Sequence, residues 1–295
     1  MCHRFLFPPR AVSNGSRHIP IPDRHPVNIL FLIANNFDAA IYGIFSRQQK
    51  KNLLLLQTEP NCKLMILMSQ HIPSDKRAEI CLQYLRQIAV NNNREWFHEH
   101  RDLYDEARAA FESMVHDLIV RIAAFDPSVQ YLTVADCTYR FYRDTRFSPD
   151  KSPYKRHFGA YINARGKKSN HGGYYMHLEP EGCLVAGGAY CLPSDVLRAV
   201  RQSICEQPET FHRIVGSDPF HSLFPVLGET RVKTIPKGFP KDFPYPEYIR
   251  CKDYSCCHPV PEDFFTAPDW LERTVGMFEI MKPFLDFVNA TIDEF

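Results

Sequence analysis

The chain has 295 residues, of which 44% are apolar and 13% aromatic, and this composition excludes global disorder. Residues 1–67 carry a net charge of +5 and residues 68–295 a net charge of −4, although the 35 Lys and Arg and the 34 Asp and Glu nearly balance. The acidic main part argues against a general nucleic-acid coat protein, so an anion site would have to be a local patch.

The first 67 residues differ from the rest of the sequence. They contain Pro and His clusters, show no sustained periodicity and lack capping signals. We expect residues 1–67 to be a poorly ordered extension outside the fold. Translation from an early start codon, with Met65 or Met68 as the true start, would explain it, and a targeting peptide is the alternative.

Localisation is suggested by what the sequence lacks. The longest apolar run near the N-terminus, residues 27–34, is too short for a membrane helix, and no secretion signal is recognisable. We therefore expect a cytoplasmic protein with reduced cysteines and no membrane partner.

Two helices are predicted next. Apolar residues recur at helical spacing between Ser74, a candidate N-cap, and Val90. A second, long helix is predicted from Asn93 to Ile122, and it ends before Pro127.

The period then changes to two, which predicts strands at residues 137–143, 157–164, 174–179 and 184–190. The short connections between the last three favour an antiparallel meander. Ser194 is expected to cap a helix, and two more helices are predicted, from Trp270 to about Met281 and from Pro283 onward. Together these elements predict a single α+β domain over residues 74–293.

The segment YRFYRDTRFSPDKSPYKRHFGAY, residues 139–161, combines aromatic rings with many cations. Its two Ser-Pro steps can each begin a short turn whose exposed N–H groups attract anions. We therefore expect a site for a phosphorylated small molecule or a nucleic-acid end, with Lys237 of the PKG segment closing over it. The expected ligand-binding residues are Arg140, Arg143, Arg146, Ser148, Lys151, Lys155 and Lys237.

An alternative stays open for the same segment. Asp144 and Asp150 could pair with the arginines and form a structural ion-pair network in a non-catalytic interaction module. A binding site predicts a concave surface whose cations lack carboxylate partners, whereas the network predicts paired cations. If a reaction occurs, Asp144, Tyr154 and His177 are the available acid–base groups, although a single strand histidine is more often structural.

No metal and no cofactor are expected. None of the ten cysteines forms Cys-x-x-Cys, and the densest cluster, CKDYSCCH at residues 251–258, has a poor spacing for one ion. The sequence contains no Gly-x-Ser-x-Gly, His-Glu-x-x-His or dinucleotide-binding motif.

Several segments carry a family resemblance: NNNREWFHEHRDLYDEA, YRFYRDTRFSPDKSPYKRHFGAYI, GGYYMHLEPEG, AGGAYCLP and KTIPKGFPKD. In this order they resemble the uncharacterised bacterial family known as domain of unknown function 2461, over about residues 83–287. The resemblance implies a shared fold and no particular activity. Residues 1–67 and the CKDYSCCH segment depart from the family pattern.

Overall fold

The computed structural model describes residues 76–294, and these belong to one compact unit, Met65–Phe295, that is separate from Met1–Leu64. The expectations for residues 1–67 and for the Ser74 cap lie outside the described residues. Within residues 76–294, no helix has the length and the apolar sequence needed to cross a membrane.

A four-stranded antiparallel sheet forms the centre of this unit. Its strands are β1 (Phe158–Ile162), β2 (Gly173–Leu178), β3 (Leu184–Ala189) and β4 (Tyr254–Pro259), in that spatial order. The expected α+β class and the meander of the first three strands are confirmed. The fourth strand was not predicted, since it lies in the cysteine-rich segment.

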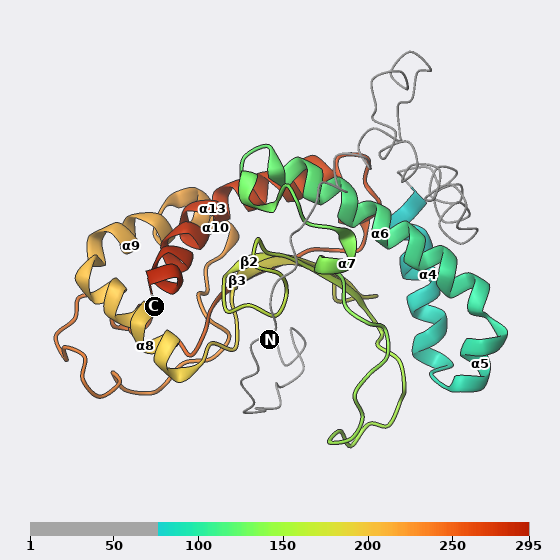
Figure 1. Ribbon diagram of the computed structural model, residues 1–295, viewed down its shortest axis with the longest axis horizontal. Coiled ribbons are helices and arrows are strands. Elements are labelled where there is room, and N and C mark those ends of the chain that lie inside the picture. The colour runs from blue at the N-terminus through green and yellow to red at the C-terminus, as the bar shows by residue number, and fades with distance from the viewer. Residues whose placement is uncertain (1–75, 295) are drawn as a thin grey trace, which may run out of the picture. The chain divides into compact units, whose positions relative to one another are not determined.

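Two long helices lie over one face of the sheet (Figure 1), α6 (Arg101–Ala123) and α13 (Trp270–Glu294). Side chains alternate along β2, and Tyr174 packs toward these helices, with its ring centroid 5.1 Å from that of Phe278. Tyr175 and His177 consequently point to the opposite face. That alternation gives the domain a helix-covered face and a second face bearing polar side chains.

The N-terminal helices differ from the prediction in one place. The first helix is α4 (Arg77–Val90). The second helix, expected from Asn93 to Ile122, is divided at His100 into α5 (Arg94–Glu99) and α6. Asn93 caps α5 by accepting a hydrogen bond from the N–H of Trp96. His100 has φ −116° and ψ 36°, outside the helical region, and its ring stacks on Trp96.

The C-terminal prediction of two helices is wrong, because α13 continues through Pro283. Residues on both sides of the proline, including Phe278, Phe284 and Val288, are buried in one continuous stripe. Packing of this stripe outweighs the loss of one backbone hydrogen bond.

The strand predicted at residues 137–143 is also wrong. A capping box between Thr133 and Asp136 begins the short helix α7 (Val134–Cys137) instead. Beyond it only isolated bridges form, Thr138 with Ala160 and Tyr142 with Tyr154. Residues 138–157 are therefore mainly a loop, which we call the basic loop, drawn in yellow-green in Figure 1 and leading into β1.

The short helix η3 (Pro127–Val129) lies between α6 and α7. Four helices connect β3 to β4, namely α8 (Ser194–Glu206), α9 (Pro208–Val215), α10 (Asp218–Leu223) and α11 (Pro246–Ile249), and α12 (Asp263–Thr266) follows β4. Bridges from Leu227 to Cys256 and from Arg231 to Cys251 place residues 227–251 at the β4 edge. The basic loop lies at the β1 edge, so the two predicted cationic segments are at opposite edges of the sheet.

Candidate functional site

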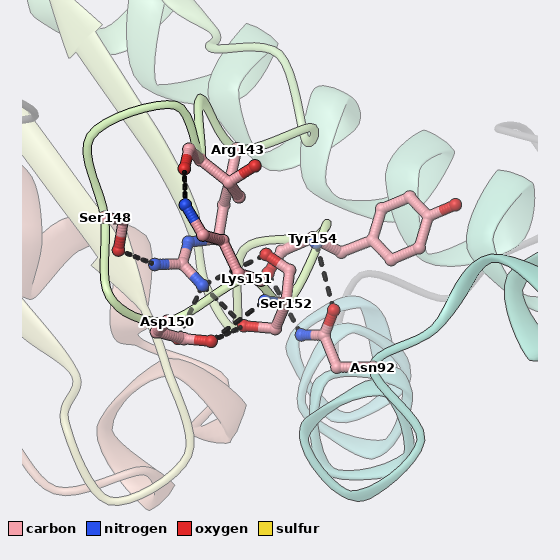
Figure 2. A network of polar contacts seen from close by, with 8 residues as sticks. Asn92, Arg143, Ser148, Asp150, Lys151, Ser152 and Tyr154 are labelled. Carbon is pink, nitrogen blue, oxygen red and sulfur yellow. Dashed lines mark hydrogen bonds and ion pairs between the residues drawn. The ribbon is translucent and has the colours of Figure 1, made fainter.

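Arg143 organises the basic loop. Its Nη1 donates to Oδ2 of Asp150 at 2.5 Å and to the carbonyl of Ser152 at 3.1 Å, and its Nη2 donates to the hydroxyl of Ser148 at 3.3 Å. Figure 2 shows the guanidinium inside the loop with these side chains around it. One planar donor group thus fixes three positions of the loop.

The two aspartates of the loop accept several hydrogen bonds and stay ionised. The hydrogen bond from the Arg146 side chain lowers the pKa of Asp144 to about 2. Hydrogen bonds from the hydroxyl and backbone N–H of Ser152, and then from Arg143, hold the pKa of Asp150 far below its usual value. Neither carboxyl group can serve as a proton donor near neutral pH.

The base of the loop is anchored to the helices. Asn92 accepts a hydrogen bond from the N–H of Tyr154 and donates one to its carbonyl, each at 3.0 Å (Figure 2). The buried Tyr154 ring stacks on Phe97, with ring centroids 4.1 Å apart. Burial also raises the pKa of Tyr154, so this side chain is better explained as an anchor than as a base.

The predicted ligand-binding residues therefore divide into groups. Arg143 and Arg146 pair with aspartates, Ser148 accepts from Arg143, and Lys151 donates to the carbonyl of Thr145. Lys237 is exposed beside α8, where Arg198 approaches the adjacent Gly238. The structure does not bring Lys237 to the basic loop.

Lys155 and Arg140 are arranged differently. Lys155 is partly buried, and its ammonium lies over the Tyr139 ring, 5.2 Å from the centroid. Burial, with Arg140 nearby, lowers the pKa of Lys155 to about 8. Among residues 76–294, neither cation has a carboxylate oxygen within 4.0 Å, in contrast to Arg143 and Arg146.

Close to Lys155 in sequence, His157 lies against His177 and Glu179 of the neighbouring strand segment. The ring centroids of His157 and His177 are 4.5 Å apart, and Nε2 of His177 lies 3.1 Å from Oε2 of Glu179. Tyr175 Oη lies 2.8 Å from the other nitrogen of His177. Burial and the neighbouring His177 hold the pKa of His157 well below its usual value, which keeps this imidazole neutral.

His177 was considered from the sequence, but His157 and Glu179 were not. The signal was present, because antiparallel pairing of Phe158 with Leu178 sets residues 157 and 179 opposite each other. Side-chain alternation then places all three on one face. Identifying this required the register of the β1–β2 hairpin, which the ten-residue connection between the two strands does not fix.

A surface cleft of about 400 Å³ lies elsewhere, between the β1–β2 hairpin and the end of α13. Its charged groups already pair with one another or with a hydroxyl: Arg165 and His171 with Asp293, Lys282 with Asp286, and Tyr174 with Asp126. This pairing makes the cleft a weaker candidate than the region around Lys155.

The CKDYSCCH segment has a structural explanation. Cys251 and Cys256 are fully or almost fully buried, and burial raises the pKa of both thiols. The Cys251 sulfur lies 3.3 Å from the carbonyl oxygens of Leu227 and Glu247, and its single S–H can donate to either. These cysteines act as small core residues around β4.

Comparison with known proteins gives a family and no close relative. The model of the conserved hypothetical protein family DUF2461 matches residues 81–287, which is more than half of the chain. Neither the curated proteins nor the solved structures gave a match. The basic loop, the histidine pair and the whole sheet lie inside the matched region, and the chain belongs to the DUF2461 family.

Proposed function

We propose that this chain binds an anionic small molecule, carrying a phosphate or carboxylate group, at Lys155 and Arg140. The observation that carries the proposal is the environment of Lys155. Its ammonium is partly buried against Tyr139, and no carboxylate oxygen among residues 76–294 lies within 4.0 Å of it.

The electrostatic argument is direct. Removing an ammonium from water without a counter-charge is costly, and a second cation close by adds repulsion. Arg140 is that second cation. An anion bound between the two side chains would offset both costs, and the planar guanidinium suits phosphate or carboxylate oxygens.

The Arg143 network is assigned a supporting role in this proposal. The N–H of Arg143 bonds to the carbonyl of Pro153, and the N–H of Lys155 bonds to the carbonyl of Phe141. The two ends of the loop are thereby paired, and the ion pair inside it holds the turn. This pairing sets Lys155 beside residues 139 and 140.

Thermal unfolding of the full chain tests the proposal. The panel contains inorganic phosphate, phosphorylated metabolites, nucleotides, dicarboxylates and short oligonucleotides, because binding to the folded state raises the melting temperature. Lys155→Met removes the cation at the centre of the proposal, and Lys151→Met is the matched control, since Lys151 is exposed and bonded to Thr145.

At least one anion should raise the melting temperature of the unmodified chain and of Lys151→Met, but not that of Lys155→Met. If no anion raises it, or if Lys155→Met responds fully, the proposal fails.

A second candidate function is a non-catalytic interaction module. The ion pairs Arg143–Asp150 and Arg146–Asp144 favour it, because they are the arrangement expected of a structural network. Failure of every anion in the panel, together with a loss of stability in Arg143→Ala, would favour this second function.

A further inference from the structure

His157, His177 and Glu179 place three possible metal-ligand atoms close together. Each offers one ligand atom, and the three atoms lie within 4.8 Å of one another. Nε2 of His177 and Oε2 of Glu179 are 3.1 Å apart. Two ligand atoms of one tetrahedral zinc ion are roughly 3.3 Å apart when the bonds are about 2.0–2.1 Å long, so small side-chain rotations would suffice.

We propose that these three side chains bind one divalent transition-metal ion of the zinc class. Two imidazoles and one carboxylate are a common donor set for such ions. Three protein ligands leave a coordination position for water or substrate, as in catalytic rather than structural sites. This inference goes beyond the anion binding proposed above and does not depend on it.

The scaffold for the three ligands is rigid. His177 is in β2 and Glu179 follows it on the same face, while His157 immediately precedes β1. Gly159 pairs with His177 in the sheet, and a Cβ at residue 159 would lie 2.6 Å from Tyr175 Oη. The glycine thus leaves room for the hydroxyl beside His177. Ligands on paired strands, or directly beside their ends as here, are held more accurately than ligands within loops.

Tyr175 supplies the outer contact that a ligating histidine requires. In the metal-bound form, Nε2 of His177 would face the ion and its Nδ1–H would donate to Tyr175 Oη, now 2.8 Å away. In the metal-free form the tautomer reverses, so that Nε2–H donates to Glu179 and Nδ1 accepts from Tyr175. The same hydrogen-bond partners fit both forms.

Access to the ion follows from the burial of the ligands. The His177 side chain is 1% exposed and that of Glu179 is 20% exposed, and His157 is partly buried. An ion would enter past Glu179 and His157, and a water molecule could complete its coordination from that side.

The charge of Lys155 gives a further test, because it should affect the affinity for a metal ion. Lys155 acts electrostatically on His157, and a positive charge there opposes a bound cation. Replacing Lys155 by methionine should therefore tighten metal binding several-fold. A histidine–glutamate hydrogen-bond network without a metal function predicts no such effect.

Metal titration of the full chain tests the inference. The purified protein is stripped with a chelator and dialysed against limiting Zn²⁺ in phosphate-free buffer, and bound zinc is measured by mass spectrometry. Cobalt substitution adds a spectrum, in which thiolate ligands would give an intense near-ultraviolet charge-transfer band. The phosphate-free buffer keeps this outcome independent of the anion proposal.

One zinc ion per chain is expected, without a thiolate band. Glu179→Gln and His157→Gln should weaken binding at least tenfold, and Tyr175→Phe about tenfold with unchanged stoichiometry. His171→Gln is the matched control, since His171 also pairs with a carboxylate, Asp293, but lies in the other cleft. Its zinc binding should equal that of the unmodified chain.

The inference is overturned if the unmodified chain retains no zinc, if the Glu179 and His157 variants bind zinc as the unmodified chain does, or if the cobalt spectrum shows thiolate ligation. Melting temperatures of all variants distinguish loss of zinc from loss of folding. Glutamine at positions 157 and 179 is chosen because both side chains are partly exposed.

Discussion

The side-chain amide of Asn92 pairs with both backbone polar groups of Tyr154, across 62 positions of sequence. Its Oδ1 accepts from the Tyr154 N–H, and its Nδ2 donates to the Tyr154 carbonyl. The asparagine thus acts like one residue of a neighbouring strand. It connects the α4–α5 junction to the end of the basic loop, at the residue whose ring stacks on Phe97.

Replacing Asn92 by alanine should destabilise the chain by about 1–3 kcal/mol, because it leaves two partly buried backbone groups without partners. Chemical denaturation measures this loss. Asn91→Ala is the matched control: the Asn91 side chain only donates to the Gln87 carbonyl at an exposed site, and a change within about 0.5 kcal/mol is expected. Equal losses in the two variants would contradict the role given to Asn92.

Gly187 in β3 leaves no space for a side chain. A Cβ there would collide with Met281 Sδ of α13 and lie 2.6 Å from the Gly173 carbonyl oxygen. Gly187→Ala should therefore cost about 1–3 kcal/mol, by forcing α13 and β2 away from β3.

Gly276, within α13, provides the opposite case, since a Cβ added there would have no atom of another residue within 4 Å beyond its own helix backbone and chain neighbours. Gly276→Ala should stabilise the chain by up to about 1 kcal/mol through helix propensity. Thermal melts of the two variants should move in opposite directions. A lowered melting temperature for Gly276→Ala would show that the helix surface is more constrained than its contacts indicate.

The sequence was sufficient to predict the α+β class and three of the four strands, because β1 to β3 are adjacent in sequence and joined by short connections. The fourth strand was not predicted because its central residue, Cys256, is buried in the core. The sequence cannot tell a buried cysteine from an exposed one, so cysteines give no clear burial pattern. The partner of this strand, β3, is also distant in sequence.

The basic loop shows a different limit. Exposure alternates as in a strand, with Phe141 buried and Tyr142 exposed, yet this segment bonds to residues 153 and 155 and adds only one bridge to the sheet. Periodicity reports which side chains are buried and not which segment accepts the hydrogen bonds. For the same reason the sequence could suggest cations for a site, but it could not show that Arg143 has a carboxylate partner and that Lys155 lacks one.

The aspartates of the loop should titrate below the usual value of 3.8. A carboxyl group whose pKa is lower in the folded chain stabilises the fold above its unfolded pKa, and this contribution disappears as the pH falls through the folded pKa. For Asp144 the loss should occur between about pH 4 and about pH 2. NMR titration of the side-chain carboxyl carbons measures both groups.

Two variants separate the causes of these pKa shifts. Arg146→Ala should raise the pKa of Asp144 and leave that of Asp150 low, because Arg146 is the main partner of Asp144 alone. Ser152→Ala should do the reverse, since Ser152 supplies the strongest hydrogen bonds to Asp150. If each variant shifted both groups equally, the loop would have unfolded and the local assignment would be wrong.

Arg143→Lys should loosen the loop although the charge is kept. An ammonium cannot reach Asp150, Ser148 and the Ser152 carbonyl together in the fixed geometry of a guanidinium. We expect amide hydrogen exchange at Ser152 to accelerate by about 5-fold, because a loss of about 1 kcal/mol of local stability changes the opening equilibrium by that factor. Arg156→Lys is the matched control at an exposed position of the same segment, and its exchange rates should not change. Unchanged exchange in Arg143→Lys would mean that the positive charge alone holds the loop. The supporting role assigned to the Arg143 guanidinium would then be wrong.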